Sequence, residues 1–190
     1  MMKNLFQILC GLFLVVSYSS CMHSEEDKVD VLIIGGGASG VTSGIQSARM
    51  GANTLILEES TWLGGMLTSA GVSAVDGNYR LPAGLWGEFK NRLSDYYGGL
   101  DSLKTGWVSN VLFEPSVGNK ILHEMVAAEN NLKVWKQACL EEVKRTGDEW
   151  VAKVKVEGQG VKTVRAKVMI DATELGDVAK MCGVKYDIGM

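Results

Sequence analysis

A glycine-rich turn between two apolar runs constrains the fold of this chain more than any other feature. The run VDVLII at 29–34 is β-branched and almost wholly apolar, which predicts a buried strand. After the turn, residues 38–50 predict a helix with Gly51 as its C-cap. The run NTLILE at 53–58 predicts a second buried strand. A strand, a helix and a strand within about thirty residues indicate parallel strands with a right-handed crossover, so the expected fold class is α/β.

The spacing of the glycines in the turn predicts a phosphate-binding site. Gly35, Gly37 and Gly40 form a G-x-G-x-x-G between the strand and the helix. The first glycine permits the tight turn, the second lets a diphosphate approach bare backbone, and the third lets the helix pack closely on the strand. At Ala38 and Ser39 the start of the helix then offers N–H groups to the phosphates. The pattern is weak alone, but the flanking strand and helix make a Rossmann-like dinucleotide site the favoured interpretation.

An acidic residue ends the second strand. Glu58 lies 18 residues after Gly40, where a carboxylate can accept hydrogen bonds from an adenosine ribose. Its charge argues against NADP, because the 2′-phosphate would be repelled. A solvated carboxylate at the strand end is the alternative. Glu59 is also a candidate binding residue, although it is less constrained and can simply face water.

The middle of the chain is less regular. Residues 60–110 are rich in Gly, Trp and Tyr and predict loops and short helices. Pro115 begins an expected helix, with His123 on its solvated surface. One face of that helix is apolar and consists of Val117, Ile121, Leu122, Met125 and Val126. The run LKVW at 132–135 predicts a third short strand.

The last part of the chain predicts a β-meander and one more strand. Three runs, at 138–146, 149–157 and 161–165, are separated by the glycine turns of GD and GQG, which favours antiparallel pairing. The run KVMIDAT at 167–173 predicts a further buried strand, and a short helix is expected around 177–182.

Three further motifs resemble one family of flavoproteins. The pair Gly64–Gly65 in TWLGGML, just beyond Glu58, is not required in an NAD-dependent dehydrogenase, and it resembles the glutathione-reductase-like FAD fold. FEPSVGNKILHEM at 113–125 and DATELGDVAKMCGVKY at 171–186 resemble segments of the FAD-dependent oxidoreductase family found in exported bacterial proteins. The resemblance covers residues 29–190. It implies a Rossmann-like βαβ FAD-binding domain with a parallel sheet and an inserted antiparallel β-meander.

The resemblance also implies a cofactor, FAD, and a set of residues that would hold its ADP moiety. Val143 and its neighbours on the first strand of the meander would contact adenine through main-chain atoms. Ala172 and Thr173 would lie along the dinucleotide, and Thr68 or Ser69 could donate nearby. Glu174 stands where the simpler signature has glycine, so its backbone must avoid left-handed conformations. The expected cofactor-binding residues are Gly35, Gly37, Ala38, Ser39, Gly40, Glu58, Glu59, Gly64, Gly65, Met66, Val143, Ala172 and Thr173.

Function follows from the same resemblance. It implies oxidation of a small organic molecule by hydride transfer to flavin, while the substrate and the catalytic base are not indicated by these residues. Members of the family are usually several hundred residues long, so the chain is expected to be the N-terminal, ADP-binding portion of such an enzyme, without the C-terminal half and the substrate domain. Two alternatives stay open: a non-catalytic nucleotide-binding remnant and an NAD-dependent dehydrogenase.

Residues 1–20 have the pattern of a secretory signal peptide. Lys3 precedes an apolar run at 5–16 and the small, polar SYSS. The run is too short for a comfortable membrane-spanning helix, and a buried N-terminal helix is the alternative. Cys21 follows directly, and YSSC resembles a bacterial lipoprotein cleavage box. This resemblance implies a lipid on Cys21, a polar tether at 21–28 and an exported periplasmic or outer-membrane (surface) lipoprotein, with plain secretion as the alternative.

Charge and cysteine content exclude some partners. The net charge is −3, and it becomes −4 when residues 1–20 and their Lys3 are removed. No basic block occurs, which argues against nucleic acid as a partner. Cys139 and Cys182 fit no metal or redox spacing, so no metal site is expected and both are interpreted as isolated buried thiols. A disulfide between them in an oxidising compartment is the alternative. The sequence does not indicate an oligomeric state.

Overall fold

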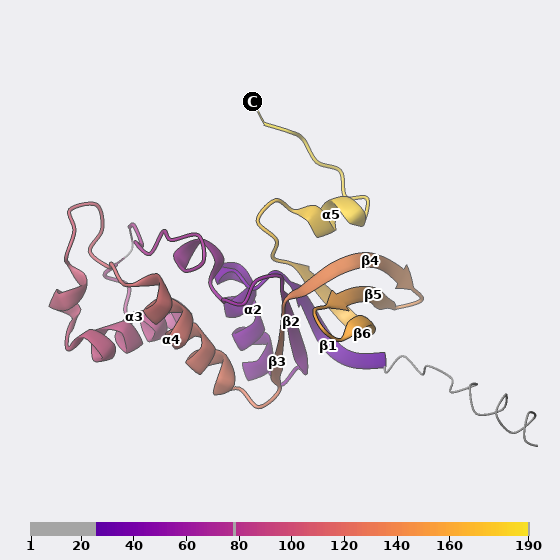
Figure 1. The fold of residues 1–190 in the computed structure, drawn as a ribbon, viewed down its shortest axis with the longest axis horizontal. Helices are drawn as coiled ribbons and strands as arrows, with labels where there is room; N and C mark the ends of the chain where they lie inside the picture. The colour runs from indigo at the N-terminus through magenta and orange to yellow at the C-terminus, as the bar shows by residue number, and fades with distance from the viewer. Residues whose placement is uncertain (1–25, 78, 190) are drawn as a thin grey trace, which may run out of the picture.

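The computed structural model describes residues 26–77 and 79–189 (Figure 1). The expected signal peptide at 1–20, the lipid-bearing Cys21 and most of the tether lie outside the described residues. Within the described ranges, no helix has both the length and the apolar character needed to cross a membrane.

One mixed sheet forms the centre of the structure. Its order is β3-β2-β1-β6-β5-β4. The neighbours β1–β2, β1–β6 and β2–β3 are parallel, while β4–β5 and β5–β6 are antiparallel. This arrangement confirms the α/β fold class with a parallel sheet and an antiparallel meander. The strands are β1 (Glu26–Ile34), β2 (Thr54–Glu58), β3 (Leu132–Lys136), β4 (Ala138–Thr146), β5 (Glu149–Val156) and β6 (Gly160–Asp171).

The last strand differs from the expectation. The runs at 161–165 and 167–173 were predicted as separate strands, but β6 is continuous and pairs antiparallel with β5 and parallel with β1. Ala166 shows this double role, since it lies opposite Trp150 on one side and Val29 on the other. No turn residue interrupts the sequence there, so the meander is an extension of the parallel sheet and not a separate sheet.

The first strand begins earlier than expected. Residues 26–28, assigned to the tether, pair with Thr163–Arg165 of β6. The guanidinium of Arg165 forms an ion pair with the carboxylate of Glu26. The long partner strand β6 therefore extends β1 beyond the apolar run that predicted it.

Two apolar layers cover the two faces of the sheet, as Figure 1 shows with helices on one side and the meander on the other. Alternate residues of β1 and β2 point to opposite faces, and both sets are buried, as parallel strands require. Ile33 and Ile56 pack with the helices α2 (Ala38–Arg49), α3 (Gly84–Tyr97) and α4 (Pro115–Ala127). Leu32 and Leu55 pack instead with the meander and with the short helix α5 (Asp177–Met181).

The helix α3 was not predicted from the sequence. Residues 60–110 were interpreted as loops and short helices, and the short 3₁₀ helices η1 (Gly65–Leu67) and η2 (Leu100–Leu103) are present, but α3 has 14 residues. A lysine interrupts the apolar pattern on its buried face. Lys90 is only 6% exposed, and its Nζ donates to the carbonyl oxygens of Tyr79 (2.6 Å) and Leu81 (2.8 Å).

The expectations for the apolar face of α4 and for the end of α2 are confirmed, whereas His123 is less solvated than expected. All five residues of the apolar face of α4 are buried. His123 on the same helix is half-buried, and burial, together with the charge of Lys136, lowers its pKa. Gly51 follows α2 with a φ of 89°, and its N–H donates to the carbonyl oxygen of Ala48, as a C-terminal glycine should.

Candidate functional site

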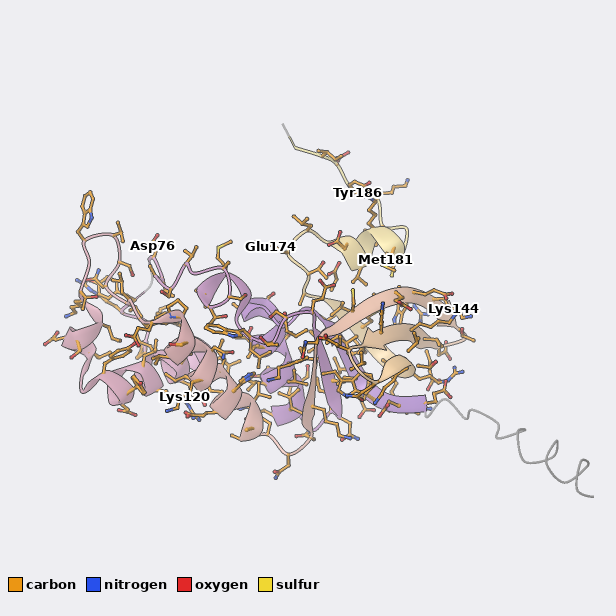
Figure 2. All side chains as sticks on the ribbon, viewed as in Figure 1. Asp76, Lys120, Lys144, Glu174, Met181 and Tyr186 are labelled. Atoms are coloured by element: carbon orange, nitrogen blue, oxygen red, sulfur yellow. The ribbon has the colours of Figure 1, made fainter. Side chains whose placement is uncertain are left out.

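A cavity of about 680 Å³ lies at the carboxyl ends of β1, β2 and β6. Its volume is within the range of small-molecule sites in proteins. The loop between β6 and α5, in which Figure 2 labels Glu174, lies beside it. The lining residues are Ile34, Gly35, Gly36, Gly37, Ala38, Ser39, Leu57, Glu58, Glu59, Gly64, Gly65, Met66, Ser69, Ala138, Leu140, Ala172, Thr173, Glu174, Leu175 and Asp177.

The glycine turn has the geometry that its spacing predicts. Gly35 has a φ of 101°, and a Cβ there would lie 2.5 Å from the carbonyl oxygen of Ala172. A Cβ on Gly40 would lie 1.8 Å from the carbonyl oxygen of Gly35, so only glycine permits this approach of α2. A Cβ on Gly37 would meet no protein atom within 4 Å. Gly37 therefore presents bare backbone to the open cavity.

The N-terminus of α2 is available to an anion. Its N-cap is Gly37, which has no side chain to cap the helix, and the first turn holds no acidic residue. The N–H of Val41 donates to the carbonyl oxygen of Gly37 (2.9 Å). The N–H groups of the first helical residues have no partner in the preceding turn of helix. Ala38 and Ser39 line the cavity, so these groups and the helix dipole favour a phosphate there.

The carboxylate of Glu58 lies across the same turn. Its Oε2 accepts a hydrogen bond from the N–H of Gly36 (2.8 Å), and its Oε1 accepts one from the N–H of Ser60 (2.7 Å). A carboxylate offers about four acceptor positions, so each oxygen retains one for a ribose hydroxyl. Gly36 was not among the predicted site residues. A Cβ there would lie 2.7 Å from Oε2 of Glu58, and the run of three glycines was the signal for it.

The pair Gly64–Gly65 contacts the glycine turn after β1. The N–H of Gly64 donates to the carbonyl oxygen of Gly36 (2.8 Å), and Gly37 and Gly64 form an isolated parallel bridge. Gly65 lies beside Gly37, since a Cβ on it would be 3.1 Å from that Cα. Met66 is 55% exposed and lines the cavity. Residues far from the turn in the sequence therefore widen one continuous backbone surface.

Two hydroxyl groups near this pair have different positions. Ser69 lines the cavity, whereas the hydroxyl of Thr68 is buried and donates to the carbonyl oxygen of Leu63. Ser69 is thus the better placed of the two expected donors.

The end of β6 supplies the opposite wall. Ala172 and Thr173 line the cavity as expected. Only Gln137, among the described non-glycine residues, has a positive φ, so Glu174 avoids the left-handed region as predicted. Gly176, with a φ of 71°, takes that conformation two residues later.

The meander contributes different residues from the predicted one. Val143 does not line the cavity, whereas Ala138 and Leu140 of the same strand do. The strand β4 starts at the cavity and runs away from it, and its register shifts between Leu140 and Glu142. The predicted strand therefore reaches the cavity, but through its beginning and not through Val143.

The thiols are free, but one of them is exposed. Cys139 was expected to be buried, yet it is exposed beside the cavity-lining Glu59. Its Sγ donates to Oε1 of Glu59 at 3.2 Å. This hydrogen bond, followed by partial burial and nearby carboxylates, raises the pKa of Cys139. Cys182, which was also expected to be buried, is only partly buried.

Comparison with known proteins gives a family and a fold. The model of a family described as FAD dependent oxidoreductase matches residues 30–190. No curated protein matches the chain.

Several solved structures are similar to it. A flavoprotein/dehydrogenase from Cytophaga hutchinsonii has a TM-score of 0.63 and 18% identity over 86% of this chain and 44% of its own. A geranylgeranyl bacteriochlorophyll reductase-like protein from Thermoplasma acidophilum has a TM-score of 0.61 and 19% identity over 87% of this chain and 44% of its own. The anhydrotetracycline hydroxylase OxyS from Streptomyces rimosus has a TM-score of 0.62 and 14% identity over 86% of this chain and 35% of its own. At these identities the likeness concerns the Rossmann-type fold, and the chain spans less than half of each of these proteins.

Proposed function

This chain belongs to the FAD-dependent oxidoreductase family, and from this premise we propose that residues 29–190 bind the ADP moiety of FAD. We propose further that this binding serves the oxidation of a small organic molecule. The observation that carries the proposal is the cavity at the glycine turn, where bare backbone, a helix N-terminus and an acidic strand end meet.

The described residues fit the ADP moiety. The space beside Gly37 that a Cβ would fill is open, and the N-terminus of α2 faces the same cavity. The diphosphate would be held there by main-chain N–H groups. The free acceptor positions of Glu58 would hold the ribose hydroxyls. Ala138 and Leu140 offer an apolar wall for the adenine.

Each part of the chain has a defined task in this mechanism. FAD, when bound, supplies the acceptor for the hydride. The glycine turn and α2 would stabilise the charge of the diphosphate through main-chain N–H groups, and Glu58 would hold the ribose. The loop after β6 forms the opposite wall of the cavity in which the dinucleotide would bind.

The nucleotide that the protein carries tests the assignment. We expect flavin absorbance in protein purified without added cofactor, or FAD uptake by the nucleotide-free protein, followed by release of FAD on heating. Recovery of NAD instead would favour the NAD-dependent dehydrogenase. Absence of binding to FAD and to ADP would refute the proposal.

A second experiment tests the role of Glu58. Calorimetry should show that the wild-type protein binds ADP more tightly than 2′-deoxy-ADP by about tenfold, because a hydrogen bond to a charged group contributes about 1.5–3 kcal/mol. The Glu58→Gln substitution should reduce this preference. Glu124→Gln, on the exposed surface of α4, is the matched control and should leave it unchanged. An equal preference in the wild type and in Glu58→Gln would contradict the assignment.

We also propose export and attachment to a membrane surface through Cys21. The support is the sequence of residues 1–21, with its basic start, apolar run and YSSC. Expression in a bacterial host should place the protein in the membrane fraction, and Cys21→Ser should release it. A wild-type protein that stays in the cytoplasm would refute the proposal.

A further inference from the structure

We infer that Asp171, which does not line the cavity, is a positioning residue that holds the loop 172–177 in its nucleotide-binding arrangement. The inference rests on the proposed function, because the loop is one wall of the proposed ADP site. The observation behind it is a set of hydrogen bonds that converge on one carboxylate.

Both carboxylate oxygens of Asp171 bind the chain that follows it. Oδ1 accepts from the N–H of Thr173 at 3.0 Å and from its Oγ1 at 2.6 Å. Oδ2 accepts from the N–H of Ala179 at 2.7 Å. The Oγ1 of Thr173 in turn accepts from the N–H of Asp177 at 2.9 Å. The carboxylate and the hydroxyl therefore join the end of β6 to the first turn of α5.

Apolar packing does little to hold this loop. Leu175 is 85% exposed, and Glu174 is exposed as well. Val178, in α5, is buried and anchors the far end of the segment. Five residues of the loop line the cavity, namely Ala172, Thr173, Glu174, Leu175 and Asp177. Ala172 packs against the helical core, but no residue from Thr173 to Asp177 is fully buried, so the polar network around Asp171 is what orders that part of the loop.

The same carboxylate also determines where an anion can bind. It already occupies N–H groups in the first turn of α5, while the first turn of α2 has no acidic residue. Burial alone would raise the pKa of Asp171, but hydrogen bonds from Thr173 and from the N–H groups of Ala179 and Val178 outweigh it and lower the pKa. Asp171 is therefore ionised at neutral pH, and the diphosphate is directed to α2.

Replacing the carboxylate by an amide tests the inference. In Asp171→Asn one amide oxygen can still accept from Thr173, but the amide NH₂ then faces the N–H of Ala179, where two donors meet. We expect the affinity for ADP to fall about tenfold if the loop keeps its binding arrangement in only about one molecule in ten, because ADP must then order a loop that the carboxylate no longer holds. The affinity for 2′-deoxy-ADP should fall by the same factor, since Glu58 is untouched. Asp148→Asn, in the turn between β4 and β5, is the matched control.

Hydrogen exchange separates positioning from general stability. In the nucleotide-free protein, the amides of 173–179 should exchange faster in Asp171→Asn, while those of β1 and β2 keep their wild-type rates. If Asp171→Asn does not fold, Thr173→Val removes only the hydroxyl at nearly constant shape, and Thr173→Ser restores it. The expected order of ADP affinity is Thr173→Ser above Thr173→Val.

The outcomes distinguish this inference from the proposed function. A wild-type protein that binds neither ADP nor FAD overturns the proposed function, whereas the exchange rates of 173–179 still report on Asp171. A wild-type protein that binds ADP, together with an Asp171→Asn variant of equal affinity and equal exchange, overturns the inference alone. A lower melting temperature with unchanged affinity would also overturn it, since that result describes a purely structural residue.

Discussion

Two glycine-to-alanine substitutions, three residues apart, should separate nucleotide binding from folding. Gly37 and Gly40 belong to the same motif, but their surroundings differ. A Cβ on Gly37 meets nothing within 4 Å, whereas a Cβ on Gly40 would lie 1.8 Å from the carbonyl oxygen of Gly35. We therefore expect Gly37→Ala to fold and not bind, and Gly40→Ala to lose stability.

The free energies of unfolding can be worked out for both variants. Gly37 has a φ of −65° and a ψ of −173°, which alanine adopts without strain. Alanine restricts the unfolded chain, which stabilises by about 0.4–1 kcal/mol. It is a poorer N-cap than glycine, which costs on the order of 1 kcal/mol. The two terms nearly cancel, so Gly37→Ala should have a free energy of unfolding within about 1 kcal/mol of the wild type.

In Gly40→Ala the favourable term does not balance the unfavourable one. Real Cβ atoms stay beyond 3.0 Å from other atoms, so the first turn of α2 or the glycine turn must shift by more than 1 Å in Gly40→Ala. Overpacking of this kind costs about 1–3 kcal/mol or more. Better helix propensity returns about 1 kcal/mol. Because the 1.8 Å contact is with backbone, the cost lies at or above the upper end of that range, and the net expectation is a loss of stability of about 2 kcal/mol or more.

Chemical denaturation and calorimetry test both expectations. Urea unfolding measures the free energy, and titration with ADP measures affinity. For Gly37→Ala we expect wild-type stability and at least a hundredfold weaker ADP binding, because the methyl group occupies the space proposed for the diphosphate. Wild-type ADP affinity in Gly37→Ala would refute the reasoning, and so would a Gly40→Ala variant as stable as the wild type.

Three further substitutions test other contacts. Gly64→Ala should lose about 2 kcal/mol or more in urea unfolding, since its φ is 107° and its Cβ would lie 2.6 Å from Leu122. Arg49→Met should cost about 1 kcal/mol or less, and less at high salt, because its ion pairs with Glu88 and Glu129 are partly exposed. Cys139 should alkylate slowly at neutral pH, and Glu59→Gln should speed the reaction by lowering the thiol pKa, as peptide mapping over a pH series will measure.

Local signals in the sequence predicted the first half of the site. The run at 29–34, the G-x-G-x-x-G and the run at 53–58 define β1, α2 and β2, because each feature depends on neighbours within a few residues. The resemblance placed the pair Gly64–Gly65 beside the cofactor, but the hydrogen bond from the N–H of Gly64 to the carbonyl oxygen of Gly36 was not predicted. Within β1, α2 and β2 the signals are local, whereas this contact joins residues far apart in the sequence.

The features that were missed depend on tertiary structure. Lys90 faces the inside of α3 because two carbonyl groups of a distant loop satisfy its ammonium, and a charged residue on an apolar face hides the helical period. The strand β6 is continuous because β1 pairs with it over residues 163–171. The resemblance pointed to Val143 and its neighbours on β4, but it did not indicate that the beginning of the strand, at Ala138 and Leu140, is the part that lines the cavity.

The sheet order explains why such distant segments form one site. The strand β1 lies between β2 and β6, so the turn after β1, the acid after β2 and the loop after β6 all leave the same edge. The helix α2 then covers one face of the sheet and the meander lies on the other, which leaves a crevice at this edge, as open α/β sheets do where their connections diverge. The donors available to a diphosphate there are main-chain N–H groups, and the charged side chains that line the cavity are all acidic: Glu58, Glu59, Glu174 and Asp177. An anion that binds at this edge would therefore be held by the main-chain N–H groups of the glycine turn and α2. The glycines of the turn would determine its affinity, since no cationic side chain among the described residues lines the cavity.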